Sequence, residues 1–253
     1  MICDLQKASL LKRASAFLLD LILLCILTAG AAFGISALTG YDTYGDRMDA
    51  LQTQYEQQYG VSFDISEQDY AKLDETQKQQ FDEAQKAFTQ NDEVIYLYNM
   101  QINLILLISS ISILAAYIIL ELIIPICFKN GQTVGKKIFG IALMRTDGVK
   151  LSGVALFART ILGKYTIETM VPLYIILMIA VGAMGLTGTI VLFLILVLQI
   201  GLIIITKTNS AIHDVLAVTV AVDLASQMIF ESEEAKIAYK KKIHAEQVES
   251  AKY

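Results

Sequence analysis

Residues 168–206 read ETMVPLYIILMIAVGAMGLTGTIVLFLILVLQIGLIIIT, and this run decides the fold class. After Glu168 it carries no charged side chain, which is typical of membrane-embedded segments. A single helix of this length would be about 58 Å long, roughly twice the thickness of the hydrocarbon core. Because G-L-T-G at 185–188 interrupts the run, we predict two helices, 168–185 and 189–206, joined by a tight turn. A re-entrant hairpin is the alternative.

The rest of the chain is also divided into long apolar blocks and polar stretches. Of its 253 residues, 55% are hydrophobic and 18% are charged, and the mean hydropathy is +0.54. Apolar blocks occupy residues 14–38, which follow Lys12 and Arg13, and residues 101–127. A cleaved signal peptide is the competing interpretation of the first block, but the block is longer than the apolar core of such a peptide. We therefore predict an all-α membrane protein with four transmembrane helices.

Charge is distributed unevenly between the polar segments. Residues 40–100 contain thirteen acidic and four basic side chains, whereas residues 128–168 contain seven basic and two acidic ones. The positive-inside rule then places both termini and the basic loop in the cytoplasm and the acidic segment outside. The lipid bilayer is the expected partner of this chain. Nucleic acid is not an expected partner, because the residues between the basic side chains of 128–168 are too apolar.

This topology divides the chain into seven segments. They are a cytoplasmic N-terminus with the first span (1–38), an extracytoplasmic helical hairpin (39–100), the second span (101–127), a basic cytoplasmic loop (128–167), the last two spans (168–206), a cytoplasmic His-Asp element (207–230) and a charged tail (231–253). The tail mixes Glu and Lys at helical spacing and is either a solvated helix or a disordered end.

The acidic segment has the composition of helices. It contains no proline, and Ser66 followed by Asp69 resembles a capping box. We predict helices at 43–59 and 66–90, folded as a hairpin around Gly60, with an aromatic seam. The expected seam residues are Tyr44, Tyr55, Tyr59, Phe63, Tyr70, Tyr96 and Tyr98. The hairpin is either a solvated spacer or a surface, residues 43–90, that docks an extracytoplasmic protein partner.

The basic loop predicts a small cytoplasmic β element. Residues 138–144 are apolar, T-D-G at 146–148 is a turn signal, and residues 149–151 and 216–223 supply further strand-like runs. The basic side chains Lys129, Lys136 and Lys137 are expected to lie among anionic lipid headgroups. Simple positive-inside charge is the alternative explanation of these lysines.

The sequence offers no sign of a cofactor, metal site or enzyme. G-Q-T-V-G-K-K at 131–137 is one residue too short for a phosphate-binding loop, and Lys137 stands where Ser or Thr is required. No Ser-His-Asp arrangement, pair of catalytic carboxylates or Cys/His cluster stands out. We expect neither a cofactor nor enzymatic activity.

Three stretches, in this order, resemble the RDD family of bacterial membrane proteins. They are KRASAFLLD at 12–20, GQTVGKKIFGIALMRTDGVKL at 131–151 followed by Arg159, and AIHDVLAVTVAV at 211–222. The family is named for one arginine and two aspartates, and the resemblance assigns these to Arg13, Asp20 and Asp214. The long acidic segment departs from the family pattern. So does Val218, which stands where a small residue is common.

The resemblance implies a bacterial inner-membrane location and two classes of function. Transport is the common proposal for the family, and some members resemble sodium/proton antiporters. A similar eukaryotic protein is a scaffold in a membrane degradation complex. We therefore carry two hypotheses, monovalent cation/proton exchange and a scaffold that docks a partner through the outer hairpin.

Carboxylates inside apolar spans are candidates for function because burying them costs free energy. Asp20 and Glu121 are two such groups, and the topology places other charged side chains at the same depth. The expected inner-leaflet cluster is Arg13, Asp20, Glu121, Arg159, His213 and Asp214. We expect Asp20 to contact Arg159, Lys164 or His213 and to meet Asp214. The cluster is either an ion or proton site or a structural charge network.

Gly30 and Gly34 form a small-xxx-small pair in the first span. The pair predicts close helix packing within or between subunits, although chance occurrence in a Gly/Ala-rich segment explains it equally well. Four helices rarely enclose a pathway, so transport would require a homo-oligomer.

Overall fold

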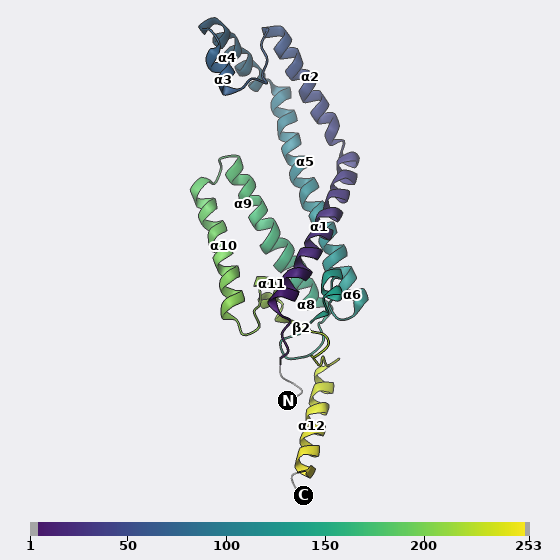
Figure 1. Ribbon diagram of the computed structural model, residues 1–253. Helices are drawn as coiled ribbons and strands as arrows, with labels where there is room; N and C mark the ends of the chain where they lie inside the picture. The colour runs from purple at the N-terminus through teal and green to yellow at the C-terminus, as the bar shows by residue number, and fades with distance from the viewer. Residues whose placement is uncertain (1–4, 251–253) are drawn as a thin grey trace. The chain divides into compact units, whose positions relative to one another are not determined.

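The computed structural model describes residues 5–250 and shows a mostly helical chain with one two-stranded sheet. The chain forms two compact units. The core unit runs to Thr28 and resumes at Ile113, and the hairpin unit is Ala29–Ser112. Figure 1 traces the elements from the N-terminus in purple to the C-terminus in yellow. Residues 1–4 and 251–253, which belong to the predicted N-terminal segment and tail, lie outside the described residues.

Four helices are long and apolar enough to cross a membrane. They are Leu10–Thr39, Asp92–Phe128, Gly153–Ala180 and Gly185–Ile205. The chain is therefore a multi-pass membrane protein with four transmembrane helices, as the hydropathy pattern predicted.

Two of these spans contain π-helical segments. The first span is α1 (Leu10–Thr39) and the fourth is α10 (Gly185–Ile205). The second span consists of α5 (Asp92–Tyr117), the π-helical η1 (Ile118–Ile123) and α6 (Ile124–Phe128). The third span consists of α8 (Gly153–Phe157), the π-helical η2 (Ala158–Met170) and α9 (Val171–Ala180). π-Helical turns frequently occur at functional sites. Here η1 carries Glu121 and η2 carries Arg159, so the buried charged side chains of both spans lie in these wider turns.

The third span begins at Gly153, not at residue 168 as predicted. The side chain of Ser152 caps its first turn by accepting a hydrogen bond from Ala155 N–H at 3.2 Å. Hydropathy suggested a loop because this stretch contains Arg159 and Lys164. Both side chains are paired with carboxylates in the core unit, so the helix can continue through them.

The turn between α9 and α10 also differs from the prediction. Helix α9 ends at Ala180 and α10 begins at Gly185, so the whole G-L-T-G stretch is helical. A Cβ atom at Gly188 would lie 2.8 Å from Ile179 Cγ1. This glycine therefore permits α10 to pack closely against α9, and the two helices run side by side in Figure 1.

The predicted β element is present in the core unit. Strand β1 (Ile141–Arg145) pairs antiparallel with β2 (Thr219–Asp223), with Ile141 opposite Asp223. One face packs against Ala8 and Ala16, and both strands are almost wholly buried. Burial on both faces explains why the strands are nearly continuous apolar runs. Residues 149–151 contribute only isolated bridges rather than a strand.

Three short or terminal helices complete the core unit. Helix α7 (Val134–Ile138) precedes β1, α11 (Ile212–Leu216) precedes β2, and α12 (Glu233–Ser250) forms the charged tail. Thr133 caps α7, since its side chain accepts a hydrogen bond from Lys136 N–H at 3.3 Å.

The hairpin unit contains α2 (Tyr41–Tyr59), α3 (Glu67–Lys72) and α4 (Glu75–Thr89). Gly60, with φ 67°, ends α2, and Ser66 caps α3 as predicted. The single helix expected at 66–90 is wrong, because Asp74 and Gln77 form a second capping box that starts α4.

The aromatic seam of this unit does not include all the residues predicted for it. Tyr55 contacts Phe88 edge-on, and Phe81 contacts both Phe63 and Tyr70. Tyr96 and Tyr98 are not part of the seam, because they are 55% and 56% exposed.

Gly30 and Gly34 do not mediate helix packing within the described part of the chain. A Cβ atom at either position would meet no atom within 4 Å. The prediction of packing within the chain is therefore wrong. Packing between subunits stays a prediction.

Val218, directly before β2, has φ 54° and thus lies in the left-handed region, which β-branched residues disfavour. Its side chain is exposed, so little packing would be lost on truncation. We expect Val218→Gly to stabilise the protein by about 1 kcal/mol, measured by thermal unfolding in detergent. Val218→Ala is the matched control and should gain less, because it keeps a Cβ atom. A lower melting temperature for the glycine variant would contradict this explanation.

Candidate functional site

Five acidic or basic side chains are buried among the described residues of the core unit. The exposed fractions are 7% for Asp20, 5% for Glu121, 9% for Lys136, 2% for Arg159 and 1% for Asp214. Burying an unpaired charge costs several kcal/mol, so each of these groups needs a partner of opposite charge. Their contacts therefore show how the core unit is held together.

Asp20, on α1, is held by the first turn of α7. Its Oδ1 atom accepts a hydrogen bond from Gly135 N–H at 2.8 Å, and its Oδ2 atom accepts one from the Thr133 hydroxyl at 2.5 Å. Lys136 Nζ lies 3.8 Å from the same Oδ2 atom. The G-Q-T-V-G-K-K stretch thus binds a carboxylate of its own chain. The partners predicted for Asp20 were wrong, because Arg159, Lys164 and His213 all pair with other carboxylates.

Glu121, on η1, faces three cationic side chains. Lys164 Nζ donates a hydrogen bond to its Oε1 atom. Its Oε2 atom lies 3.8 Å from Lys136 Nζ and 4.0 Å from Arg159 Nη1. Both Oε2 and Arg159 Nη1 are buried without a hydrogen-bond partner among the described residues. Lys136 Nζ therefore lies between an oxygen of Asp20 and an oxygen of Glu121 that accepts no hydrogen bond.

Asp214, on α11, is held by two arginines. Its Oδ1 atom lies 3.0 Å from Arg159 Nη2 and accepts hydrogen bonds from Arg159 Nε and the Thr219 hydroxyl, at 3.1 and 2.9 Å. Arg13 Nη2 lies 3.6 Å from the Oδ2 atom. Burial raises the pKa of Asp214, but the Arg159 guanidinium outweighs it together with smaller contributions, so the pKa stays well below its usual range. This carboxylate remains charged at neutral pH.

His213 joins Asp214 to a fourth carboxylate. Its Nδ1 atom lies 2.8 Å from both carboxylate oxygens of Glu168, and its Nε2 atom lies 3.5 Å from Asp214 Oδ2. Burial, with Arg159 nearby, lowers the pKa of His213, which favours the neutral ring at pH 7. Because a carboxylate can only accept, Nδ1 carries the proton in this arrangement.

These contacts form one electrically balanced network. It contains four carboxylates (Asp20, Glu121, Glu168, Asp214) and four cations (Arg13, Lys136, Arg159, Lys164) around the neutral His213. We call this set the charge network. Asp20 was expected to contact Asp214, but no direct contact joins them. They are connected by successive ion pairs through Lys136, Glu121 and Arg159.

Lys136 is the member whose position the sequence did not reveal. It was assigned to lipid headgroups, but it is buried in the charge network, whereas Lys129 and Lys137 are exposed. Lys137 Nζ lies 3.7 Å from the centroid of the Phe128 ring. Burial lowers the pKa of Lys136 to about 8, although Glu121 acts in the opposite direction. Thr133, three residues before Lys136, is a typical helix-capping residue. It could have predicted that Lys136 lies in the first turn of a helix.

Two glycines allow the backbones around the charge network to approach closely. A Cβ atom at Gly135 would lie 2.3 Å from the backbone oxygen of Ala16, and one at Gly163 would lie 2.5 Å from His213 Cβ. Contacts this short do not occur in folded proteins. Both positions therefore require glycine, one beside each end of the network.

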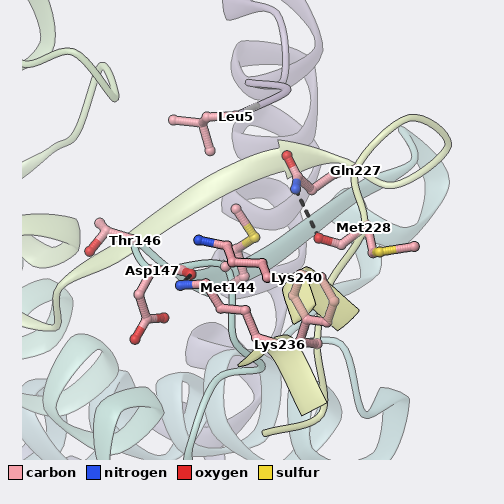
Figure 2. A pocket seen from close by; sticks show the side chains of 10 residues that line it. Leu5, Met144, Thr146, Asp147, Gln227, Met228, Lys236 and Lys240 are labelled. Carbon is pink, nitrogen blue, oxygen red and sulfur yellow. Dashed lines mark hydrogen bonds between the residues drawn. The ribbon is translucent and has the colours of Figure 1, made fainter. Parts of the chain in front are cut away.

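A separate cavity of about 200 Å³ lies between the turn after β1 and α12. Figure 2 shows Lys236 and Lys240 at this cavity, near Asp147. Lys236 Nζ donates a hydrogen bond to Asp147 O, and Gln227 donates one to Met228 O at 2.8 Å. No member of the charge network lines this cavity. Within residues 5–250, no group of three His, Cys, Asp or Glu side chains could hold a metal ion.

Comparison with known families matches residues 7–218 to the RDD family. The matched range contains every member of the charge network. No curated protein and no solved structure matches the chain.

Gly135→Ala should destabilise the protein by about 1–3 kcal/mol, because the added methyl group would collide with α1 and with Asp20. Thermal unfolding in detergent measures the effect. Gly201→Ala in α10 is the matched control, since its Cβ atom would meet nothing within 4 Å, and this variant should be neutral or slightly more stable. Equal melting temperatures for the two variants would show that α7 does not pack against α1 as described.

Proposed function

The chain belongs to the RDD family, and from that premise we propose that it exchanges a monovalent cation for a proton at the charge network. One observation carries the proposal. The buried ammonium of Lys136 lies 3.8 Å from a carboxylate oxygen of Asp20 and 3.8 Å from one of Glu121. A lysine shared by two carboxylates occupies the place that a small cation could take.

The proton of Lys136 can leave near physiological pH. The pKa of this lysine is lowered to about 8 by burial. When Lys136 loses its proton, the charge network carries one uncompensated negative charge beside Asp20 and Glu121. A cation entering there restores neutrality.

The available ligands fit a hard monovalent ion. Asp20 Oδ2, Glu121 Oε2 and Thr133 Oγ1 are oxygen atoms grouped around Lys136 Nζ, and the Glu121 oxygen accepts no hydrogen bond among the described residues. Carboxylate and hydroxyl oxygens suit such ions. One positive charge replaces another, so the network stays neutral. A divalent ion would leave a net buried charge that costs several kcal/mol.

The other members of the charge network position this exchange site. Lys164 and Arg159 hold Glu121 from the η2 side, and Gly135 N–H and Thr133 hold Asp20. Helix α1 buries only Ala16 and Asp20, which leaves most of the first span free to face lipid or a second copy. We propose a homo-oligomer in a bacterial inner membrane, with both termini cytoplasmic.

Proteoliposomes with an imposed pH gradient test the exchange for Na⁺, K⁺ and Li⁺. Cation uptake by the wild-type protein should rise with pH, with a midpoint near the Lys136 pKa of about 8, because the proton occupies the site below this pH. Lys136→Arg should abolish exchange, since arginine does not release its proton. Asp20→Asn should lower the flux, because one of the two carboxylates is lost.

Lys137→Arg is the matched control, since Lys137 is the exposed neighbour of the buried lysine. It should leave both the flux and its pH dependence unchanged. Absence of flux for all three ions, or unchanged flux in Lys136→Arg, would refute cation/proton exchange.

A scaffold function is the second candidate, and the hairpin unit favours it. Leu51, Val94 and Leu97 form a core of this unit, to which no member of the charge network contributes. An exchanger has no evident need for such a unit. We propose that residues 43–90 dock a protein partner outside the membrane. Deleting residues 45–92 should abolish crosslinking to that partner while membrane insertion and cation exchange persist, and a phenotype that survives the deletion would exclude docking.

A further inference from the structure

A cavity of about 300 Å³ lies where the second span ends and the third begins. Ile126, Lys129, Lys150, Ser152 and Leu156 are among the residues that line it. We propose that this cavity binds the phosphate headgroup of an anionic phospholipid. None of its lining residues belongs to the charge network, so the proposal is independent of the exchange reaction.

The position of the cavity favours a lipid over free phosphate. The second span ends at Phe128 and the third begins at Gly153, so the cavity lies beside the ends of two apolar helices. Ile126, which lines the cavity, is exposed, and so are Val154 and Phe157 in α8, so acyl chains can contact these side chains. The cationic and apolar side chains found here match the two parts of a phospholipid.

Lys129 adopts a backbone conformation that favours glycine. It follows the last residue of α6 with φ 66°, the left-handed position at which helices usually have glycine. A strained residue is commonly retained where its side chain has a function. Lys129 is exposed and forms no ion pair within residues 5–250, so its ammonium is available to a phosphate.

Lys150 supplies the second charge. Its backbone N–H donates to Phe230 O at 2.8 Å, which fixes its position, while its Nζ atom lies 2.8 Å from a carboxylate oxygen of the exposed Glu231. An ion pair with an exposed partner contributes little to stability. A phosphate can therefore replace Glu231. The Ser152 hydroxyl, at the start of the third span, can donate to the same phosphate.

Native mass spectrometry of the full-length protein in detergent tests the site. We would titrate phosphatidylglycerol, phosphatidylcholine and inorganic phosphate separately. Phosphatidylglycerol should bind most tightly. Lys129→Gly should weaken its binding about fivefold, as expected for one lysine near a phosphate, while the melting temperature is unchanged or higher. Lys150→Gln should weaken binding similarly, and Glu231→Gln should strengthen it.

Lys241→Gln is the control, because this exposed lysine of α12 does not line the cavity. It should bind phosphatidylglycerol like the wild-type protein. Equal binding of the two lipids, or phosphate binding as tightly as phosphatidylglycerol, would overturn the proposal. So would unchanged affinity in Lys129→Gly or Lys150→Gln, or an equal loss in Lys241→Gln. Failure of Glu231→Gln to strengthen binding would exclude Lys150 as a headgroup ligand.

Discussion

The ammonium of Lys136 lies between two buried carboxylates, and the core unit depends on this contact. Asp20 comes from the first span and Glu121 from the second, while Lys136 belongs to the short helix between the second span and β1. A carboxylate left without a cation at such depth would cost about 3–5 kcal/mol. One side chain therefore joins the first span to the second span and to α7, more than 100 residues later in the sequence. The pKa of this side chain is close to physiological pH.

The remaining charges extend this arrangement without upsetting its balance. Arg159 connects Glu121 to Asp214, and Asp214 leads into β2, which pairs with β1. Helix ends, strand pairing and ion pairs are thereby coupled within one unit. Asp20, Glu121 and Asp214 each have a cation in contact, and Glu168 contacts the neutral His213, so the network stabilises the folded core unit. Lys136 differs from a purely structural member, because burial lowers its pKa to about 8.

Features that depend on local pattern could be predicted from the sequence. Hydropathy identified four spans, strand-like apolar runs with a turn signal identified the β element, and Ser66 identified the start of α3. Features that depend on ion pairs between distant parts of the chain could not be predicted. The start of the third span at Gly153 was missed because Arg159 and Lys164 resemble loop residues until their carboxylate partners are known. Lys136 and Lys137 are adjacent in sequence, yet only the first is buried, and nothing in composition distinguishes them.

The most direct test is a ¹⁵N NMR titration of the Lys136 side-chain nitrogen in the detergent-solubilised protein, with and without Na⁺. Without Na⁺ the nitrogen should titrate near pH 8, and Na⁺ should move the midpoint to lower pH because the two cations compete for one position. A midpoint near that of a solvent-exposed lysine, about 10.4, or a midpoint indifferent to Na⁺, would contradict the assignment of Lys136 as the exchangeable cation.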